Sequence, residues 1–228
     1  MAPPSDAEVA AHLGNLVSPA RRARIEDVLA ARTRFLTVVL EDIYQPHNAS
    51  AVLRSCECFG VQDVHIVEGR NRFEVNSDVA LGAGKWLSLH RYGGADPQEN
   101  LAACLDGLKG AGYRLVAATP HADDCPLDEV PVDRPLAVLL GTEELGLSPA
   151  ALEKADAYLK IPMFGFTESF NISVSAALVL RELTRRLRQA PVPWMLGAEA
   201  KEELRLEWYR RSLRRSDLIE ARFRAGGT

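Results

Sequence analysis

The chain has 228 residues, of which 47% are hydrophobic and 25% are charged, and its formal net charge is −4. This composition is typical of a globular protein that buries a core, and no apolar run reaches the roughly 18 residues of a membrane helix. A secretory leader is not visible. Four cysteines without metal-ligand spacing (Cys56, Cys58, Cys104 and Cys125) predict reduced thiols, no metal site and a cytoplasmic protein.

The charge is distributed unevenly along the chain. Residues 36–180 contain 10 Lys and Arg against 20 Asp and Glu, whereas residues 181–228 contain 12 against 7. Residues 1–35 contain 5 against 4. An acidic middle with Arg-rich ends is typical of terminal interaction segments, although a solvated helix surface gives the same asymmetry.

The first predicted helix begins at Ser18-Pro19, because Ser caps a helix and Pro fits its first position. Arg21, Arg22 and Arg24 lie in its first two turns, where the helix dipole disfavours cations. Helix stability therefore does not explain these arginines, and phosphate is a candidate ligand for them.

From residue 36 onward, strands and helices alternate. The predicted strands are 36–41, 64–69, 86–92, 114–119, 135–141 and 158–163, and the predicted helices are 49–60, 98–112, 148–155 and 171–188. This alternation predicts an α/β fold with a largely parallel sheet. A linker with Pro and Gly (190–200) and a basic amphipathic helix (201–215) follow.

A first motif, Gln45-Pro46-His47-Asn48, lies where a strand ends and a helix begins, at the sheet edge where α/β folds bind ligands. Asn48 could also simply cap the helix. Arg54 follows in a helix of small apolar residues and has to reach water or an anion, because burying a lone charge is costly. A surface-facing arginine is an equally good interpretation.

A second motif follows the strand 135–141. It runs into Gly141-Thr142-Glu143-Glu144, and a glycine at a strand end permits close approach of the backbone to a ligand. A plain glycine-containing turn would give the same sequence. The G-x-G-x-x-G pattern of dinucleotide-binding folds is absent.

A third motif leads from Ile161-Pro162 through an apolar loop to Ser169-Phe170-Asn171 and a helix rich in small residues. The apolar loop needs cover from a ligand or from a second subunit. The alternative is a core helix that Asn171 caps.

Together, QPHNASAVLR (45–54), LLGTEELGLS (139–148) and IPMFGFTESFNISVSAAL (161–178) resemble, in order and spacing, the three motifs of the SpoU/TrmH family of SPOUT methyltransferases. The likeness covers roughly residues 20–188. It implies an enzyme that transfers a methyl group from S-adenosyl-L-methionine to a ribose 2′-hydroxyl of RNA. It also implies a trefoil-knotted α/β domain and an obligate homodimer with the active site across its interface.

The resemblance also implies residue roles by motif position. Arg54 matches the arginine proposed to take the 2′-hydroxyl proton, and Asn48 would hold Arg54 or the substrate. Glu143, Ser169 and Asn171 match the polar residues of the second and third motifs. The cofactor-contacting positions are Thr119, Leu140, Gly141, Ile161, Met163 and Phe170. The expected RNA contacts are His47, Arg21, Arg22, Arg24, Arg210, Arg211, Arg214 and Arg215.

Two residues of the third motif depart from the usual family pattern. A bulkier Phe170 reshapes the expected adenine pocket, and Glu168 adds a negative charge near a site that accepts RNA. Both change details of the expected site and leave the reaction class unchanged.

The implied organisation is an N-terminal basic helical extension (1–35), a SPOUT methyltransferase catalytic domain (36–189) and a C-terminal basic helical extension (190–228). The short N-terminal part and the basic ends resemble the tRNA-modifying members of the family, which implies tRNA as the substrate and the D-loop guanosine at position 18 as the target. Phosphate contacts by basic ends would provide affinity rather than sequence reading. Alternatives are the same chemistry on ribosomal RNA, a non-catalytic RNA-binding protein, and a generic doubly wound nucleotide-binding enzyme. The motif residues Asn48, Arg54, Glu143 and Asn171 argue against loss of activity.

Overall fold

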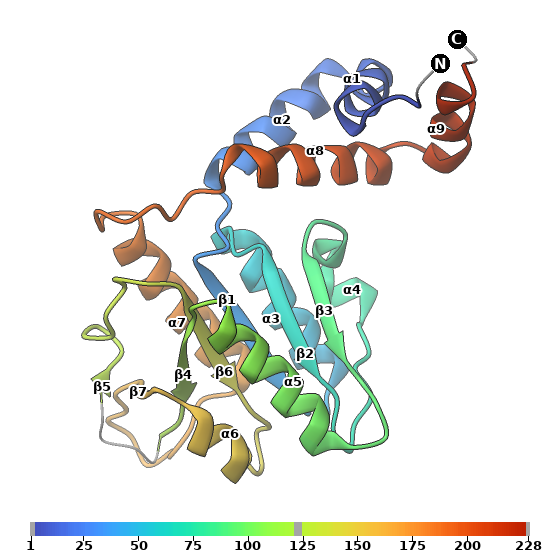
Figure 1. Cartoon of the computed structure of the whole chain (residues 1–228). Coiled ribbons are helices and arrows are strands. Elements are labelled where there is room, and N and C mark those ends of the chain that lie inside the picture. Colours follow the sequence, from blue (N-terminus) through green and yellow to red (C-terminus); the bar gives the residue numbers. More distant parts are fainter. Residues whose placement is uncertain (1–2, 121–124, 227–228) are drawn as a thin grey trace. The chain divides into compact units, whose positions relative to one another are not determined.

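The computed structural model describes residues 3–120 and 125–226, and these group into two compact units. One unit combines the described residues up to Arg32 with those from Met195 onward, and the other extends from Thr33 to Trp194. We call them the helical unit and the sheet unit, and Figure 1 labels the elements of each.

The helical unit consists of α1 (Asp6–Leu16), α2 (Pro19–Ala31), α8 (Ala198–Ser212) and α9 (Ser216–Arg224). Helix α8 packs against α1, α2 and α9. Its Trp208 ring is buried and lies 5.4 Å from the guanidinium carbon of the buried Arg32. The apolar side chains that fill the centre of the unit are Val9, Leu13, Ile25, Leu29, Leu204 and Leu206.

Helix starts of the predicted type are present in both units. The Ser18 hydroxyl accepts a hydrogen bond from the Arg21 amide at 3.3 Å, with Pro19 at the first helical position. Ser148 caps α6 in the same way. Helix α1 was not predicted, although its capping box is legible in the sequence: Ser5 and Glu8 bond each other's backbone amides.

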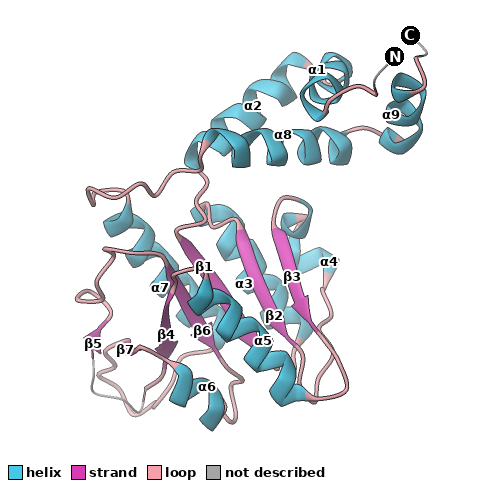
Figure 2. Cartoon of the chain, viewed as in Figure 1, coloured by secondary structure: helices cyan, strands magenta, loops and turns pink. Residues whose placement is uncertain are grey.

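The sheet unit contains a parallel sheet of seven strands in the order β3-β2-β1-β6-β4-β7-β5. The strands are β1 (Leu36–Glu41), β2 (Asp63–Val67), β3 (Ser88–Tyr92), β4 (Arg114–Ala118), β5 (Cys125–Pro126), β6 (Leu136–Leu140) and β7 (Ala157–Lys160). The helices are α3 (Pro46–Phe59), α4 (Ser77–Ala80), η1 (Ala83–Lys85), α5 (Pro97–Gly110), α6 (Pro149–Lys154) and α7 (Ile172–Leu187). The predicted α/β fold with a largely parallel sheet is confirmed (Figure 2).

Helix α3 begins three residues earlier than the predicted start at residue 49. Gln45 occupies its N-cap position and Pro46 its first turn. Asn48 therefore lies inside the helix, and the interpretation of Asn48 as the cap is wrong. Its amide is left available for contacts with other segments.

The alternation of side chains along β1 separates two cores. Leu36, Val38 and Leu40 belong to the core on the α3 and α7 side, whereas Val39 belongs to the core that includes side chains of α5 and α6. Helices thus cover both faces of the sheet, as is usual for a parallel sheet. The carboxyl edge of the strands remains accessible, and this is the edge where such folds bind ligands.

Among the described residues, no helix is long and apolar enough to cross a membrane. The His, Cys, Asp and Glu side chains of these residues form no group of three that could hold a metal ion.

Candidate active site

Three polar side chains from three separate segments meet at the carboxyl edge of the sheet. Asn48 lies in the first turn of α3, Glu143 in the turn after β6, and Asn171 at the start of α7. Both side-chain amides donate to Oε1 of Glu143: Asn171 at 2.8 Å and Asn48 through a short hydrogen bond. The Asn171 amide also donates to Oδ1 of Asn48 at 3.2 Å. We call these residues the polar triad.

The orientation of the Asn171 amide follows from its second role as the cap of α7. Its Oδ1 accepts from the Ser173 amide at 2.9 Å and from the Ser173 hydroxyl at 2.6 Å. The oxygen must face these donors, so the nitrogen faces Glu143. Asn171 is therefore both the predicted helix cap and a member of the polar triad.

The turn that carries Glu143 is closed on itself. Thr142 and Gly146 exchange two backbone hydrogen bonds of 3.0 Å. A Cβ atom at Gly141 would lie 2.2 Å from the Gly146 carbonyl, so position 141 admits only glycine. The sequence suggested that this glycine permits close approach of the backbone to a ligand. In the structure, the backbone of Gly141 packs closely against the Gly146 end of its own turn.

A cavity of about 370 Å³ lies beside the polar triad. Its volume falls within the range of about 300–1,000 Å³ that is usual for small-molecule sites. All six predicted cofactor-contacting residues line it: Thr119, Leu140, Gly141, Ile161, Met163 and Phe170. Glu143 and Ser169 line it as well, and so do the two departing residues, Glu168 and Phe170.

Sequence reasoning missed further residues of this site. Leu147, Leu159 and Ser175 line the cavity, and Oε1 of Gln45 accepts a hydrogen bond from the Asn48 amide at 2.9 Å. Leu147, Ser175 and Gln45 lie within quoted motifs, whereas Leu159 lies near the start of the predicted strand 158–163. Membership of a motif was the available signal for the first three residues.

Arg54 does not belong to the cavity lining in the single chain. It is exposed on α3, and it has no hydrogen-bond or ion-pair partner among the described residues. His47 is also exposed, in the first turn of the same helix. The structure therefore brings the polar triad to the cavity and leaves Arg54 on the protein surface.

The predicted RNA-binding arginines of the helical unit fall into two groups. Arg210 forms a bidentate ion pair with Glu220, with both contacts at 2.8 Å, and Arg211 pairs with Glu207. The Arg210 guanidinium holds the pKa of Glu220 below its usual value. Arg24, Arg214 and Arg215 are exposed, as is Arg21, while Arg22 is half-buried. Neither of these two ion pairs holds the other five predicted RNA-binding arginines, which are Arg21, Arg22, Arg24, Arg214 and Arg215.

Comparison with known proteins identifies the family. The model of the SpoU rRNA Methylase family matches residues 35–181. The chain belongs to this family. A tRNA (guanosine(18)-2′-O)-methyltransferase of Borreliella burgdorferi is 40% identical over 208 residues, which cover 91% of this chain and 93% of that protein.

Solved SpoU structures share the fold. The crystal structure of a TrmH/SpoU tRNA-modifying enzyme of A. aeolicus has a TM-score of 0.73 and 26% identity, and the match covers 86% of this chain and 98% of that one. The SpoU methyltransferase AviRb of Streptomyces viridochromogenes, solved in complex with AdoMet, has a TM-score of 0.60 and 24% identity. That match covers 72% of this chain and 65% of AviRb.

Proposed function

We propose that this chain is an S-adenosyl-L-methionine-dependent tRNA (guanosine-2′-O-)-methyltransferase of the cytoplasm that modifies the D-loop guanosine at position 18. The observation that carries the proposal is the convergence of the polar triad on a cavity lined by all six predicted cofactor-contacting residues. The function of the B. burgdorferi relative supports this choice of substrate, because the match to that protein extends over nine tenths of this chain.

The cavity suits S-adenosyl-L-methionine by size and by lining. Leu140, Ile161 and Phe170 offer apolar surface for an adenine ring, and Thr119 and Ser169 offer hydroxyl groups. Glu143 supplies a carboxylate beside a cofactor that carries a positive sulfonium. When bound, the cofactor would supply the methyl group.

The polar triad would act by positioning. Glu143 is held by the amides of Asn48 and Asn171, so the three segments keep a fixed geometry at the cavity. Such preorganisation is a main source of rate enhancement where the protein brings two reactants together. In this proposal, Asn48 and Asn171 orient the ribose or the guanidinium that acts on its 2′-hydroxyl.

A second protomer would supply the Arg54 that acts on the 2′-hydroxyl proton at this cavity. An arginine is a poor base at its ordinary pKa, so a phosphate contact or a proton relay would have to assist it. Its exposed position outside the cavity lining is compatible with a site that is completed by a second copy of the chain.

Exposed apolar side chains support the proposed homodimer. Val174 and Leu178, one turn apart on α7, are 44% and 40% exposed, and Phe164 and Phe166 in the preceding loop are almost fully exposed. Soluble monomers rarely leave large contiguous apolar patches uncovered. Light scattering should give the mass of a dimer, and Leu178→Arg should shift it toward the monomer.

The proposal extends to two finer features of the family. The sheet unit would contain a trefoil knot in its C-terminal part, as the resemblance of the three motifs to the SpoU/TrmH family implies. The terminal segments 1–35 and 190–228 would serve as basic extensions that contact tRNA around the catalytic domain 36–189. The exposed Arg21, Arg24, Arg214 and Arg215 support this role.

A methyl-transfer assay tests the function directly. Purified protein is incubated with tritiated S-adenosyl-L-methionine and an unmodified tRNA transcript. A matched transcript carries 2′-deoxyguanosine at position 18, which removes the acceptor hydroxyl and keeps the base. We expect incorporation into the first transcript only. Equal incorporation into both would move the target to another nucleotide, and none into either would refute the tRNA function.

Ribosomal RNA is the second candidate substrate, because the family to which the chain belongs is named for methylases of ribosomal RNA. The same assay with ribosomal RNA lacking modifications separates the two. Incorporation into ribosomal RNA alone would favour this candidate.

A further inference from the structure

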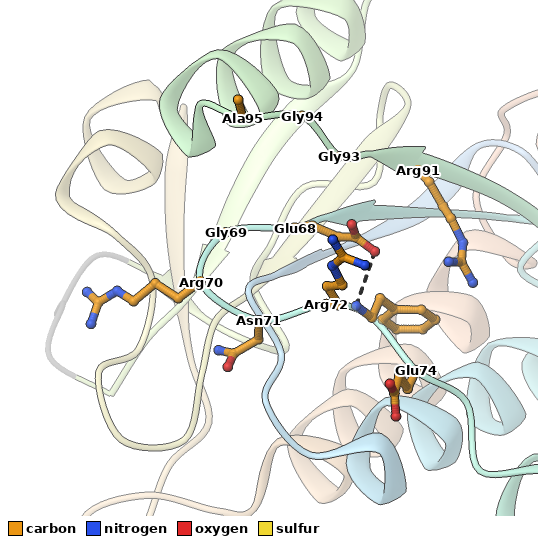
Figure 3. Close-up of a pocket in the computed structure, with 11 residues that line it drawn as sticks. Glu68, Gly69, Arg70, Asn71, Arg72, Glu74, Arg91, Gly93, Gly94 and Ala95 are labelled. Atoms are coloured by element: carbon orange, nitrogen blue, oxygen red, sulfur yellow. Dashed lines mark hydrogen bonds between the residues drawn. The ribbon is translucent and has the colours of Figure 1, made fainter.

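A second cavity, of about 660 Å³, lies at the same carboxyl edge of the sheet, beyond β2 and β3. Two loops form it, residues 68–74 after β2 and residues 93–95 after β3 (Figure 3). None of the residues that line it belongs to the first cavity. The sequence motifs did not include either loop.

Carboxylates turned toward the backbone hold the first of these loops. Oδ1 of Asp42 accepts from the Asn71 backbone amide at 2.8 Å, and Oε1 of Glu68 accepts from the Phe73 amide at 3.1 Å. A Cβ atom at Gly69 would lie 2.8 Å from the Asp42 carboxyl carbon, so the loop packs closely on it. Asp42 itself has a left-handed backbone with φ of 53°, which costs energy for any residue other than glycine.

Three arginines extend from this fixed frame. Arg70, Arg72 and Arg91 are all exposed, and Arg70 and Arg72 have no ion-pair partner among the described residues. The Arg91 guanidinium carbon lies 5.3 Å from the centre of the buried Phe73 ring, which restricts its motion. In Figure 3, Arg72 and Arg91 lie on one side of the loop and Arg70 extends away from them.

We propose that Arg70, Arg72 and Arg91 bind backbone phosphates of the RNA substrate. This proposal rests on the proposed function, since it concerns the RNA that the methyltransferase modifies. Guanidinium groups match phosphate oxygens in geometry and charge. Because the arginines diverge, they suit a chain with repeated phosphates better than a single compact anion.

The carboxylates of the cavity do not cancel this charge. Glu68 accepts the Phe73 amide, and its Oε2 lies so close to Gly93 that a Cβ atom there would be 2.6 Å away. Glu74 is exposed and is the second acidic side chain of the lining. Among the residues that line the cavity, three arginines outnumber two carboxylates, in a sheet unit that is otherwise acidic.

The position of this surface fits an RNA strand that reaches the polar triad. In the sheet, β2 is next to β1 and β1 is next to β6, so two to three strand spacings of about 5 Å separate the two sites. The segment that follows the loop 68–74 is also bonded to α3, the helix that carries Asn48: the Asn76 backbone amide donates to the Ser50 hydroxyl at 2.7 Å. A few nucleotides beyond the methylated ribose would bring phosphates over the arginines.

The experiment measures binding of full-length protein to an unmodified tRNA transcript at several salt concentrations. The variants are Arg70→Ala/Arg72→Ala and Arg91→Ala. We expect the dissociation constant of the double variant to rise roughly tenfold at moderate salt, and the slope of log affinity against log salt to fall by about 0.7 to 0.9 per lost contact. Affinity for S-adenosyl-L-methionine and the melting temperature report whether the fold is intact.

Arg134→Ala is the matched control. Arg134 is an exposed arginine two residues before the start of β6, at the opposite edge of the same sheet. Its replacement removes the same charge and should leave RNA affinity and the salt slope unchanged. A double variant with affinity within twofold of the wild type, or a control that weakens binding equally, would overturn the proposal.

The two proposals fail in distinguishable ways. Wild-type protein that binds tRNA but transfers no methyl group would refute the tRNA methyltransferase function alone. The arginine variants would still test the phosphate contacts, because that experiment measures binding and not methyl transfer. If ribosomal RNA proves to be the substrate, the same variants are compared on that RNA. Wild-type protein that binds neither RNA would refute both proposals.

Discussion

The sheet unit and the helical unit use their polar side chains in different ways. In the sheet unit, Asn48, Glu143 and Asn171 come from distant segments and bond one another at a cavity. In the helical unit, Arg210 and Arg211 are bonded to Glu220 and Glu207 of the same unit. The first group meets because β1, β6 and β7, the strands that precede its members, all end at the same edge of the sheet. The ion pairs of the second group depend on which acidic residue lies near each arginine. A polar residue at a strand end is thus a stronger functional signal than an arginine on a helix.

The largest expected effect concerns Arg54, which lies in the sheet unit but does not line its cavity. We expect Arg54→Ala to lower methyl transfer by about 1,000-fold, since positioned proton transfer contributes typically 10²–10⁴-fold. Affinity for S-adenosyl-L-methionine should hardly change, because Arg54 does not line the cavity. Single-turnover kinetics and calorimetric cofactor binding measure the two quantities. A variant with normal rates would remove Arg54 from the mechanism.

Acid should destabilise the sheet unit more than the helical unit, because the sheet unit contains the buried His65. The pKa of His65 falls from 6.5 to about 4, mainly because the ring is buried and also because His90 lies nearby, while Asp63 opposes the shift. The native state keeps His65 neutral while the unfolded chain binds a proton, so this stability is present above pH 6.5 and is lost as the pH falls toward 4. The expected loss is about 3 kcal/mol in the sheet unit.

Hydrogen exchange between pH 7 and pH 4.5, resolved for each unit, measures this loss. His65→Gln keeps a hydrogen-bonding group opposite Tyr92, whose hydroxyl lies 3.2 Å from Nδ1 of His65, and removes the titration. The variant should lose less stability on acidification than the wild type. Equal losses in both proteins would assign the acid sensitivity to other groups.

Glu143 tests whether the polar triad acts as a unit. Glu143→Ala removes the acceptor of both amides and should lower methyl transfer by about 100-fold, as expected for loss of orientation at a reacting centre. Glu143→Gln retains an oxygen for the same two donors and should cost only about tenfold, because the charge is lost while the hydrogen bonds remain. Equal effects of the two variants would mean that the charge, rather than the geometry, matters.

Arginines of the helical unit should differ in whether their replacement lowers tRNA affinity or thermal stability, according to whether they form an ion pair. Arg214→Ala/Arg215→Ala removes two exposed guanidinium groups and should weaken tRNA binding by roughly tenfold with little change in melting temperature. Arg210→Ala breaks the bidentate ion pair with Glu220 and should lower the melting temperature more than it lowers affinity. Filter binding and calorimetry measure both. The opposite pattern would show that the ion pair opens to bind phosphate.

Much of the fold was predictable because its signals are local. The Ser-Pro helix starts at Ser18 and Ser148 and the apolar strand segments required only propensity and periodicity. The meeting of Glu143 with Asn48 was predictable in outline, because β1 and β6 both end at that edge. The adjacency of these two strands was not predicted, because the pattern of residues does not give the order of strands in a sheet.

The remaining features depend on contacts that are distant in the sequence. The exposed position of Arg54 depends on how α3 packs against α7. The partner of Arg210 is Glu220, which lies ten residues away on the next helix. Helix α1 was missed although Ser5 and Glu8 signal its start, because its apolar face is interpretable only once α8 covers it.

The helical unit is made from both ends of the chain, and this has a consequence for biosynthesis. Helices α1 and α2 leave the ribosome first, but α8, which buries their apolar residues, follows about 170 residues later. At about 5–20 residues per second, Leu13 and Leu29 wait roughly ten to thirty seconds for their cover. The sheet can assemble during that interval, so a nascent chain would acquire its catalytic body before it acquires the basic surface of its ends. Premature termination after Trp194 would leave an apolar N-terminal segment for chaperones or proteases to recognise.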